Sequence, residues 1–182
     1  LAGQWKERFE LVRGATPLQE AIPPVMIVVC DNTEIAKVFF QAISGERQEE
    51  VARPDGKSEK KTVYGTSEVL PEFANTEECR RTIQIDSRIL ERLEVGAGST
   101  RDKEAEALRK VIETVGRRGE PGEHVRCVVS VSMLTEGWDA NNVTHILGVR
   151  AFSSQLLCEQ VVGRGLRRRL PAGTQFSLHT NG

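Results

Sequence analysis

Three long apolar runs divide the chain, and polar or small residues follow each of them. The runs span 25–30, 125–131 and 143–149. Because the first run is unbroken rather than alternating, we expect it to form a strand that is buried on both faces, as in a parallel sheet covered by helices, and the other two runs predict further strands. A shorter alternating run, 82–86, predicts a fourth strand.

Residues with helical periodicity lie between the first two runs and after the third, and a loop separates the second run from the third. After the first run, Asp31 and Glu34 have capping-box spacing, and Gly45 has the position of a helix end. Further helices are predicted over 4–13 and 101–115. The helix after the first run has its apolar stripe at Ile35, Val38, Phe39, Ala42 and Ile43.

The alternation of strands and helices predicts an α/β fold with a parallel sheet flanked by helices in three layers. Residues 1–24 are expected to form a short helix and a connector, 25–169 the domain, and 170–182 a tail. Within the domain, 46–81 is charged and interrupted by proline and glycine. We expect this segment to be an insertion, and the tight-turn sequence at 53–56 predicts a surface hairpin.

Positive charge is concentrated near the C-terminal end. Residues 150–182 hold five arginines and one glutamate, a balance of +4, whereas the net charge of the whole chain is -1. The four cysteines form no C-x-x-C pair and three lie in apolar runs, so we expect reduced thiols, no structural zinc site and a cytoplasmic location. No apolar segment has the length of a membrane span.

A fourth predicted helix, 153–168, carries the basic cluster. Its two faces differ: Gln160, Gly163, Arg164 and Arg167 share one stripe, and mostly apolar residues occupy the other side. Guanidinium groups held by a buried helix suit a polyphosphate, because they are permanently charged and bind its oxygens in pairs. The alternative is a solvated basic helix end that complements the helix dipole.

Three segments, each in or after an apolar run, resemble motifs of superfamily 2 helicases and translocases. Residues 25–33 have the position of motif IV, and 128–139 resemble motif V. The amino-acid sequences of these segments are most similar to the restriction-subunit group, which comprises the helicase part of type III restriction enzymes and related DEAD/DEAH-like proteins. The resemblance implies that 25–169 is a second RecA-like lobe. Motif VI is matched by Gln160-x-x-Gly163-Arg164-x-x-Arg167.

The resemblance implies roles for the motif VI residues. In such enzymes ATP lies between two lobes, and the second lobe directs arginines towards the γ-phosphate, where charge develops in the transition state. Arg164 and Arg167 match these catalytic arginines, and Gln160 and Gly163 match positions at the ATP.

Motif V implies further contacts with ATP. Gly137 matches the glycine that lets the backbone approach the ligand, and Asp139 matches the aspartate that bonds a ribose hydroxyl or steadies the arginines. An Asx turn before Asn141 is the alternative role for Asp139.

Nucleic-acid contacts are expected at the ends of the first two runs. Many relatives have threonine where this chain has Val131, so nearby hydroxyls would have to supply that contact. At the start of the helix after the first run, polar side chains could donate to a backbone phosphate, and helix capping is the equally good alternative. The candidates for nucleic-acid contact are Asn32, Thr33, Ser130, Ser132 and Thr135.

The sequence contains neither a complete phosphate-binding glycine loop nor an acidic motif that would hold magnesium. Gly56-Lys57-Ser58 resembles the end of such a loop, but Val51 stands where the loop requires glycine. The resemblance implies the C-terminal motor lobe of an ATP-dependent DNA helicase or translocase of a restriction system, and the missing loop and acidic motif imply that this lobe is inactive as an ATPase by itself. A non-catalytic nucleic-acid-binding or regulatory module derived from such a lobe is the alternative.

The resemblance also implies the partners of such a lobe. ATP and Mg²⁺ would be held mainly by a first RecA-like lobe of the same polypeptide, and DNA would be the nucleic acid, although RNA fits the same contacts. A modification subunit is a further candidate partner. We expect no membrane contact.

Overall fold

A computed structural model describes residues 1–14, 23–52, 58–85, 100–131 and 143–149, and the side chains of 100–105 are not among those described. The predicted surface turn at 53–56, the tail from 170 and most residues of motifs V and VI lie outside these ranges. In chain order the elements are α1 (Ala2–Arg13), β1 (Val25–Cys30), α2 (Thr33–Ser44), β2 (Glu46–Ala52), β3 (Ser58–Tyr64), the 3-10 turn η1 (Pro71–Phe73), β4 (Thr82–Ile85), α4 (Thr100–Glu113), β5 (Cys127–Val131) and β6 (Val143–Val149).

Four strands form one parallel sheet in the order β4-β5-β1-β6. Every residue of β1 and β5 is buried, which explains why β1 is an unbroken apolar run and why Ser130 is the one polar residue of β5. The predicted strands 25–30 and 143–149 are confirmed residue by residue, and β5 begins two residues later than the predicted run.

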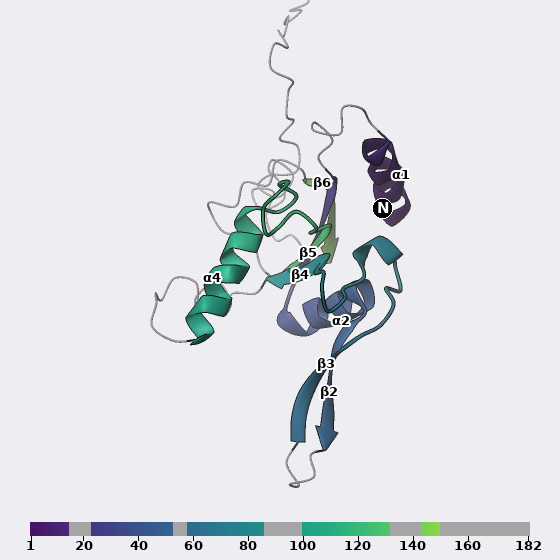
Figure 1. Cartoon of the computed structure of the whole chain (residues 1–182). Coiled ribbons are helices and arrows are strands. Elements are labelled where there is room, and N and C mark those ends of the chain that lie inside the picture. The colour runs from purple at the N-terminus through teal and green to yellow at the C-terminus, as the bar shows by residue number, and fades with distance from the viewer. Residues whose placement is uncertain (15–22, 53–57, 86–99, 132–142, 150–182) are drawn as a thin grey trace, which may run out of the picture.

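Helices cover both faces of this sheet, which gives three layers (Figure 1). One face of β1, with Val25, Ile27 and Val29, packs with Ile112 at the end of α4. The other face packs with residues of α1, α2 and η1, including the fully buried Trp5. The sheet and its helix layers are compatible with a RecA-like fold.

The start and end of α2 follow from two residues that flank it. Asn32 is the N-cap, because its Oδ1 accepts a hydrogen bond of 2.9 Å from the backbone nitrogen of Ile35. Gly45 ends the helix in the left-handed conformation, with φ of 69°. The predicted helix end at Gly45 is therefore confirmed, whereas the capping side chain is Asn32 rather than Asp31.

The apolar stripe of α2 differs from its prediction at one position. Ala36 and Ile43 are buried against the sheet, whereas Val38 is 65% exposed. Val38 lies about 200° around the helix from Ala36, because each residue advances the helix by about 100°. Ala36 brings α2 close to the sheet, and Val38 is consequently turned to solvent.

The strands β2 and β3 form a separate antiparallel hairpin that projects from the body of the molecule (Figure 1). Its outer part is exposed on both faces, and cross-strand pairs bring Glu49 beside Lys61 and Glu50 beside Lys60. The surface hairpin expected in 46–81 is confirmed. Its assignment as an insertion into a RecA-like lobe stays a prediction.

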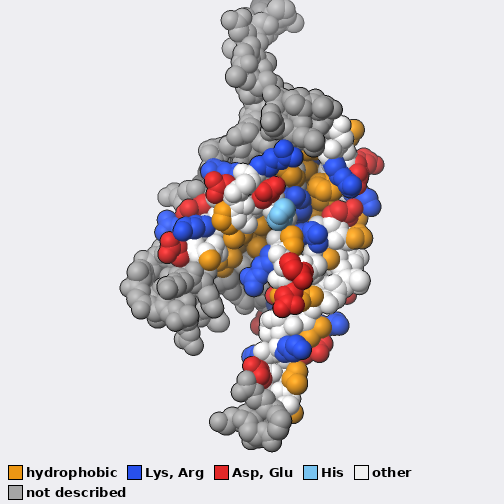
Figure 2. Space-filling model, viewed as in Figure 1, with side chains coloured by type: hydrophobic (Ala, Val, Ile, Leu, Met, Phe, Trp, Pro, Cys, Tyr) orange, Lys and Arg blue, Asp and Glu red, His pale blue; other side chains and the backbone are white. Residues whose placement is uncertain are grey.

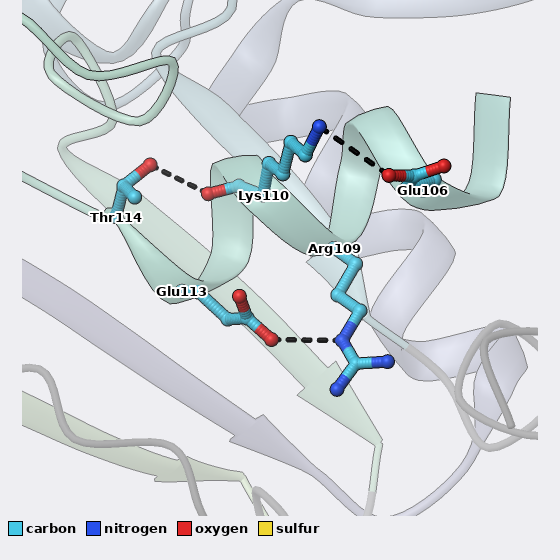
Figure 3. A network of polar contacts seen from close by, with 5 residues as sticks. All are labelled: Glu106, Arg109, Lys110, Glu113 and Thr114. Carbon is cyan, nitrogen blue, oxygen red and sulfur yellow. Dashed lines mark hydrogen bonds and ion pairs between the residues drawn. The ribbon is translucent and has the colours of Figure 1, made fainter. Parts of the chain in front are cut away.

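The outer side of α4 is polar. Two ion pairs at i, i+4 spacing join Arg109 to Glu113 and Lys110 to Glu106, with nitrogen–oxygen distances of 2.8 and 3.3 Å (Figure 3). The Glu113 carboxylate also raises the pKa of Arg109 by hydrogen bonding. These pairs are exposed, so their role is to keep one side of α4 solvated while Ile112 packs on the sheet.

Candidate nucleotide and nucleic-acid site

The ends of three adjacent strands lie level with one another at one edge of the sheet. Cys30, the last residue of β1, pairs with Val131 at the end of β5 and with Val149 at the end of β6. In open α/β sheets, ligands bind outside this carboxyl edge. The segments that follow all three strands carry the residues singled out by the sequence, so this edge is the candidate site.

Asn32 and Thr33 follow β1 at this edge and begin α2. The Asn32 side chain is exposed and its oxygen is engaged with the backbone nitrogen of Ile35. The helix N-terminus places partial positive charge here, which suits a phosphate. The capping role of Asn32 is confirmed, and its contact with a phosphate stays a prediction.

Ser130, near the end of β5, is the candidate for nucleic-acid contact that the structure describes at the second strand. It is 1% exposed near the end of β5, on the same face as Val128. A ligand that approaches from solvent does not reach this hydroxyl in the present conformation. Ser130 therefore acts first as a buried polar residue of the sheet.

The remaining predicted site residues lie outside the described ranges, so the structure neither groups nor separates them. They comprise two candidates for nucleic-acid contact, two residues of motif V and four of motif VI. In chain order these are Ser132, Thr135, Gly137, Asp139, Gln160, Gly163, Arg164 and Arg167.

A polar hollow beside α2 was not foreseen from the sequence. Its volume is about 360 Å³, and α2, the start of β2, and β4 contribute its walls. The wall that β4 contributes is distant in sequence from α2 and β2, so no local pattern reveals the hollow. The lining residues are Thr33, Glu34, Lys37, Phe40, Gln41, Glu46, Arg47, Gln48 and Gln84.

Charges of both signs are interspersed over the surface. Figure 2 shows Lys and Arg next to Asp and Glu over the visible face, including the projecting hairpin. The hollow has the same character, with Lys37 and Arg47 opposed by Glu34 and Glu46. This balance differs from the single-sign groove that tracks a nucleic-acid backbone.

At the opposite, amino edge of the sheet, one arginine contacts α1. Arg126, just before β5, lies 5.8 Å from the centre of the Phe9 ring of α1, and its Nη1 donates to the backbone oxygens of Glu123 and Val125. Burial lowers the pKa of Arg126 from its ordinary value. Arg126 therefore joins the start of β5 to α1.

Comparisons with models of protein families, with curated proteins and with solved structures return no match. In the part of the chain that the structure describes, no helix is long and apolar enough to cross a membrane. The same part gathers no cluster of three His, Cys, Asp or Glu side chains that could hold a metal ion.

Proposed function

We propose that this chain is the second RecA-like lobe of an ATP-dependent DNA helicase or translocase of the kind found in restriction systems. One observation carries the proposal: the strands β5, β1 and β6 end at the same edge of the sheet, because Cys30 is paired with both Val131 and Val149. A lobe of this kind requires motifs IV, V and VI to meet along one edge. The segment that resembles motif IV includes β1, the segment that resembles motif V begins within β5, and the segment that resembles motif VI follows β6 in the sequence.

In the proposed motor, Arg164 and Arg167 supply positive charge to the γ-phosphate of ATP held on a first lobe. Gln160, Gly163 and the Gly137–Asp139 turn complete the side of the nucleotide site that this lobe contributes. Because the arginines reach the phosphate only when the lobes close, hydrolysis is coupled to lobe movement.

The proposed DNA contacts are to the phosphate backbone. Asn32 and Thr33 at the start of α2, with Ser132 and Thr135 after β5, bind it without reading the base sequence. Binding is therefore expected to depend weakly on sequence and strongly on salt.

The test measures DNA-stimulated ATP hydrolysis by a polypeptide that contains this lobe and a first lobe. Replacing Arg164→Ala or Arg167→Ala is expected to lower turnover by about 10³-fold or more. Arg169→Ala is the matched control, because it removes the same charge one residue beyond the predicted helix, about 140° or more from either arginine if the helix continues to it. Turnover near the wild-type value in both Arg164→Ala and Arg167→Ala would refute the proposal.

A second measurement separates the motor from a regulatory module. Titration calorimetry of the isolated chain with ATP is expected to show weak binding at best, because the phosphate loop is supplied by the other lobe. A micromolar dissociation constant would contradict this division of the site. A full polypeptide that binds DNA but never hydrolyses ATP would favour the regulatory module instead.

A further inference from the structure

The polar hollow beside α2 adjoins the free edge of β2. Three consecutive residues of β2, Glu46, Arg47 and Gln48, line it, and no residue of β3 does. Alternate residues of a strand point to opposite faces, so consecutive lining residues identify an edge rather than a face. The hollow therefore lies on the side of β2 that is away from β3.

The hairpin ladder shows which backbone groups point into this side. Gly65 donates to the oxygen of Gly45 at 2.9 Å, which makes these two residues a hydrogen-bonded pair in line with the ladder. Because such pairs alternate, the N–H and C=O groups of Gln48, Glu50 and Ala52 point away from β3. Within the described ranges β2 and β3 form a sheet of two strands, so no third strand uses these groups.

The side chains of β2 specify what a third strand would carry. Glu49 and Glu50 lie on opposite faces of the hairpin. On β3, Lys61 is paired with Glu49 and Lys60 with Glu50. An antiparallel strand on the other edge of β2 meets the same two glutamates. Opposite charges across neighbouring strands are favourable, so an occupant with two consecutive basic residues is complementary.

Some residues at the inner end of the hollow can bind a carboxylate, beside the acidic Glu34 and Glu46, and the Glu46 carboxylate already accepts a hydrogen bond from Asn75. An antiparallel strand beside β2 runs towards α2, so its C-terminal end arrives among Lys37, Gln41 and Gln84. Lys37 is exposed, and none of the described acidic side chains forms an ion pair with it. A cation and two amide side chains at this position can bind a terminal carboxylate.

We propose that the β2 edge and Lys37 form a docking site for an extended polypeptide that adds a third, antiparallel strand to the hairpin. The occupant carries two adjacent basic residues followed, a few residues later, by a carboxylate. Main-chain hydrogen bonds supply the affinity, and the glutamates and Lys37 set register and direction. This site does not depend on the proposed motor function.

The probe is a synthetic peptide with the sequence of residues 58–66, which places two lysines opposite Glu49 and Glu50 and ends in a free carboxylate. It is titrated into the isotope-labelled full chain, and backbone amide shifts are followed by NMR. We expect binding with a dissociation constant of about 0.1–1 mM. The shifted amides should be those of Gln48 and Glu50 and of the residues around Lys37.

Two proline variants test the edge itself. Gln48→Pro removes an outward-pointing N–H of β2 and is expected to weaken binding about tenfold or more. Thr62→Pro removes the equivalent group on the outer edge of β3 and should leave binding unchanged. The two variants match because Gln48 and Thr62 face each other and share one side-chain hydrogen bond of 2.7 Å.

A charge substitution tests whether Lys37 binds the terminal carboxylate of the peptide. Lys37→Gln should weaken the free-acid peptide about two- to fivefold, but should not change binding of its C-terminally amidated form. Equal effects on both forms would overturn the carboxylate assignment. Absence of peptide binding, equal loss in both proline variants, or shifts centred on β3 amides would overturn the docking site, the last by indicating strand exchange. An oligothymidylate that moves the same β2 amides and is lost in Gln48→Pro would replace the polypeptide with nucleic acid.

Discussion

The side-chain amide of Asn75 joins Glu46, at the base of the hairpin, to the first residues of β4. Its nitrogen donates 2.9 Å hydrogen bonds to Oε2 of Glu46 and to the backbone oxygen of Thr82. Its oxygen accepts from the backbone nitrogens of Arg81 and Thr82 at 2.8 Å. Asn75 is 1% exposed, so a single satisfied buried amide fixes the hairpin relative to the sheet.

Replacing Asn75→Ala should therefore destabilise the fold by about 3 kcal/mol, because it leaves buried backbone groups of Arg81 and Thr82 without their partner. For a chain of this size we expect the melting temperature to fall by roughly 10 °C. Gln48→Ala removes an exposed amide bond instead and should change the melting temperature little. Similar effects of the two substitutions in calorimetry would argue against the central role of Asn75.

A comparison of alanine substitutions at two glycines can separate the cost of backbone strain from the cost of steric contact. Gly45 and Gly119 have nearly the same positive φ, 69° and 74°, but a Cβ at Gly45 would lie 2.5 Å from the oxygen of Gly65, whereas one at Gly119 meets nothing within 4 Å. Gly119→Ala should cost about 1–2 kcal/mol for the left-handed conformation alone. Gly45→Ala should cost a further 1–3 kcal/mol or so, measured by urea unfolding, because the two ends of the hairpin cannot move apart freely. Equal costs would mean that the hairpin base adjusts without strain.

The helix α1 depends on one aromatic side chain. Trp5 is fully buried, its ring centre is 4.4 Å from that of Phe73, and its Nε1 donates to the oxygen of Pro24 at 3.1 Å. Trp5→Ala should destabilise the protein by about 3–5 kcal/mol in denaturant unfolding. Leu11→Ala, on the same helix but 70% exposed, should have little effect. A small loss in Trp5→Ala would show that α1 contributes little to the packing of this domain.

Two buried thiols should resist both ionisation and alkylation. Burial raises the pKa of Cys30 and of Cys127 above the ordinary value of 9.0, and for Cys127 the nearby Cys30 adds to the shift. Peptide mapping after iodoacetamide treatment of the folded protein at pH 8 should show Cys79, which is half-buried, modified before either. Above about pH 9 the unfolded thiols lose protons that the folded ones keep, so stability should fall with rising pH. Rapid native labelling of Cys127 would contradict its burial.

Much of the fold follows from local pattern. The strands 25–30 and 143–149 were predictable to the residue. The first is an unbroken apolar run bounded by polar residues, which fits a covered parallel strand, whereas β6 is only partly buried. The Asn75 network was not predictable, because it depends on Glu46, which is distant in sequence and belongs to another element. The exposure of Val38 was missed because the width of an apolar stripe does not say which of its edges meets the sheet.

The candidate site was predictable only in its location. Apolar runs with motif-like segments place the candidates at strand ends, and the pairing of Cys30 with Val131 and Val149 brings these strand ends level. The burial of Ser130 was not visible in its sequence, because a serine near a strand end can face either a covered or an open side. The hollow beside α2 needed the three-dimensional arrangement of α2, β2 and β4.

The two roles considered for Asn32, capping α2 and contacting a phosphate, can be separated by one substitution. Asn32→Asp keeps an oxygen that accepts from the nitrogen of Ile35, so α2 should keep its stability. The added negative charge should repel a phosphate, so the polypeptide with both lobes should bind single-stranded DNA several-fold more weakly at low salt. Asn32→Ala removes the cap as well and should lower the melting temperature by the equivalent of about 1 kcal/mol. Fluorescence anisotropy with labelled DNA and thermal unfolding read the two effects separately. DNA binding that is unchanged in Asn32→Asp would leave Asn32 with the cap alone.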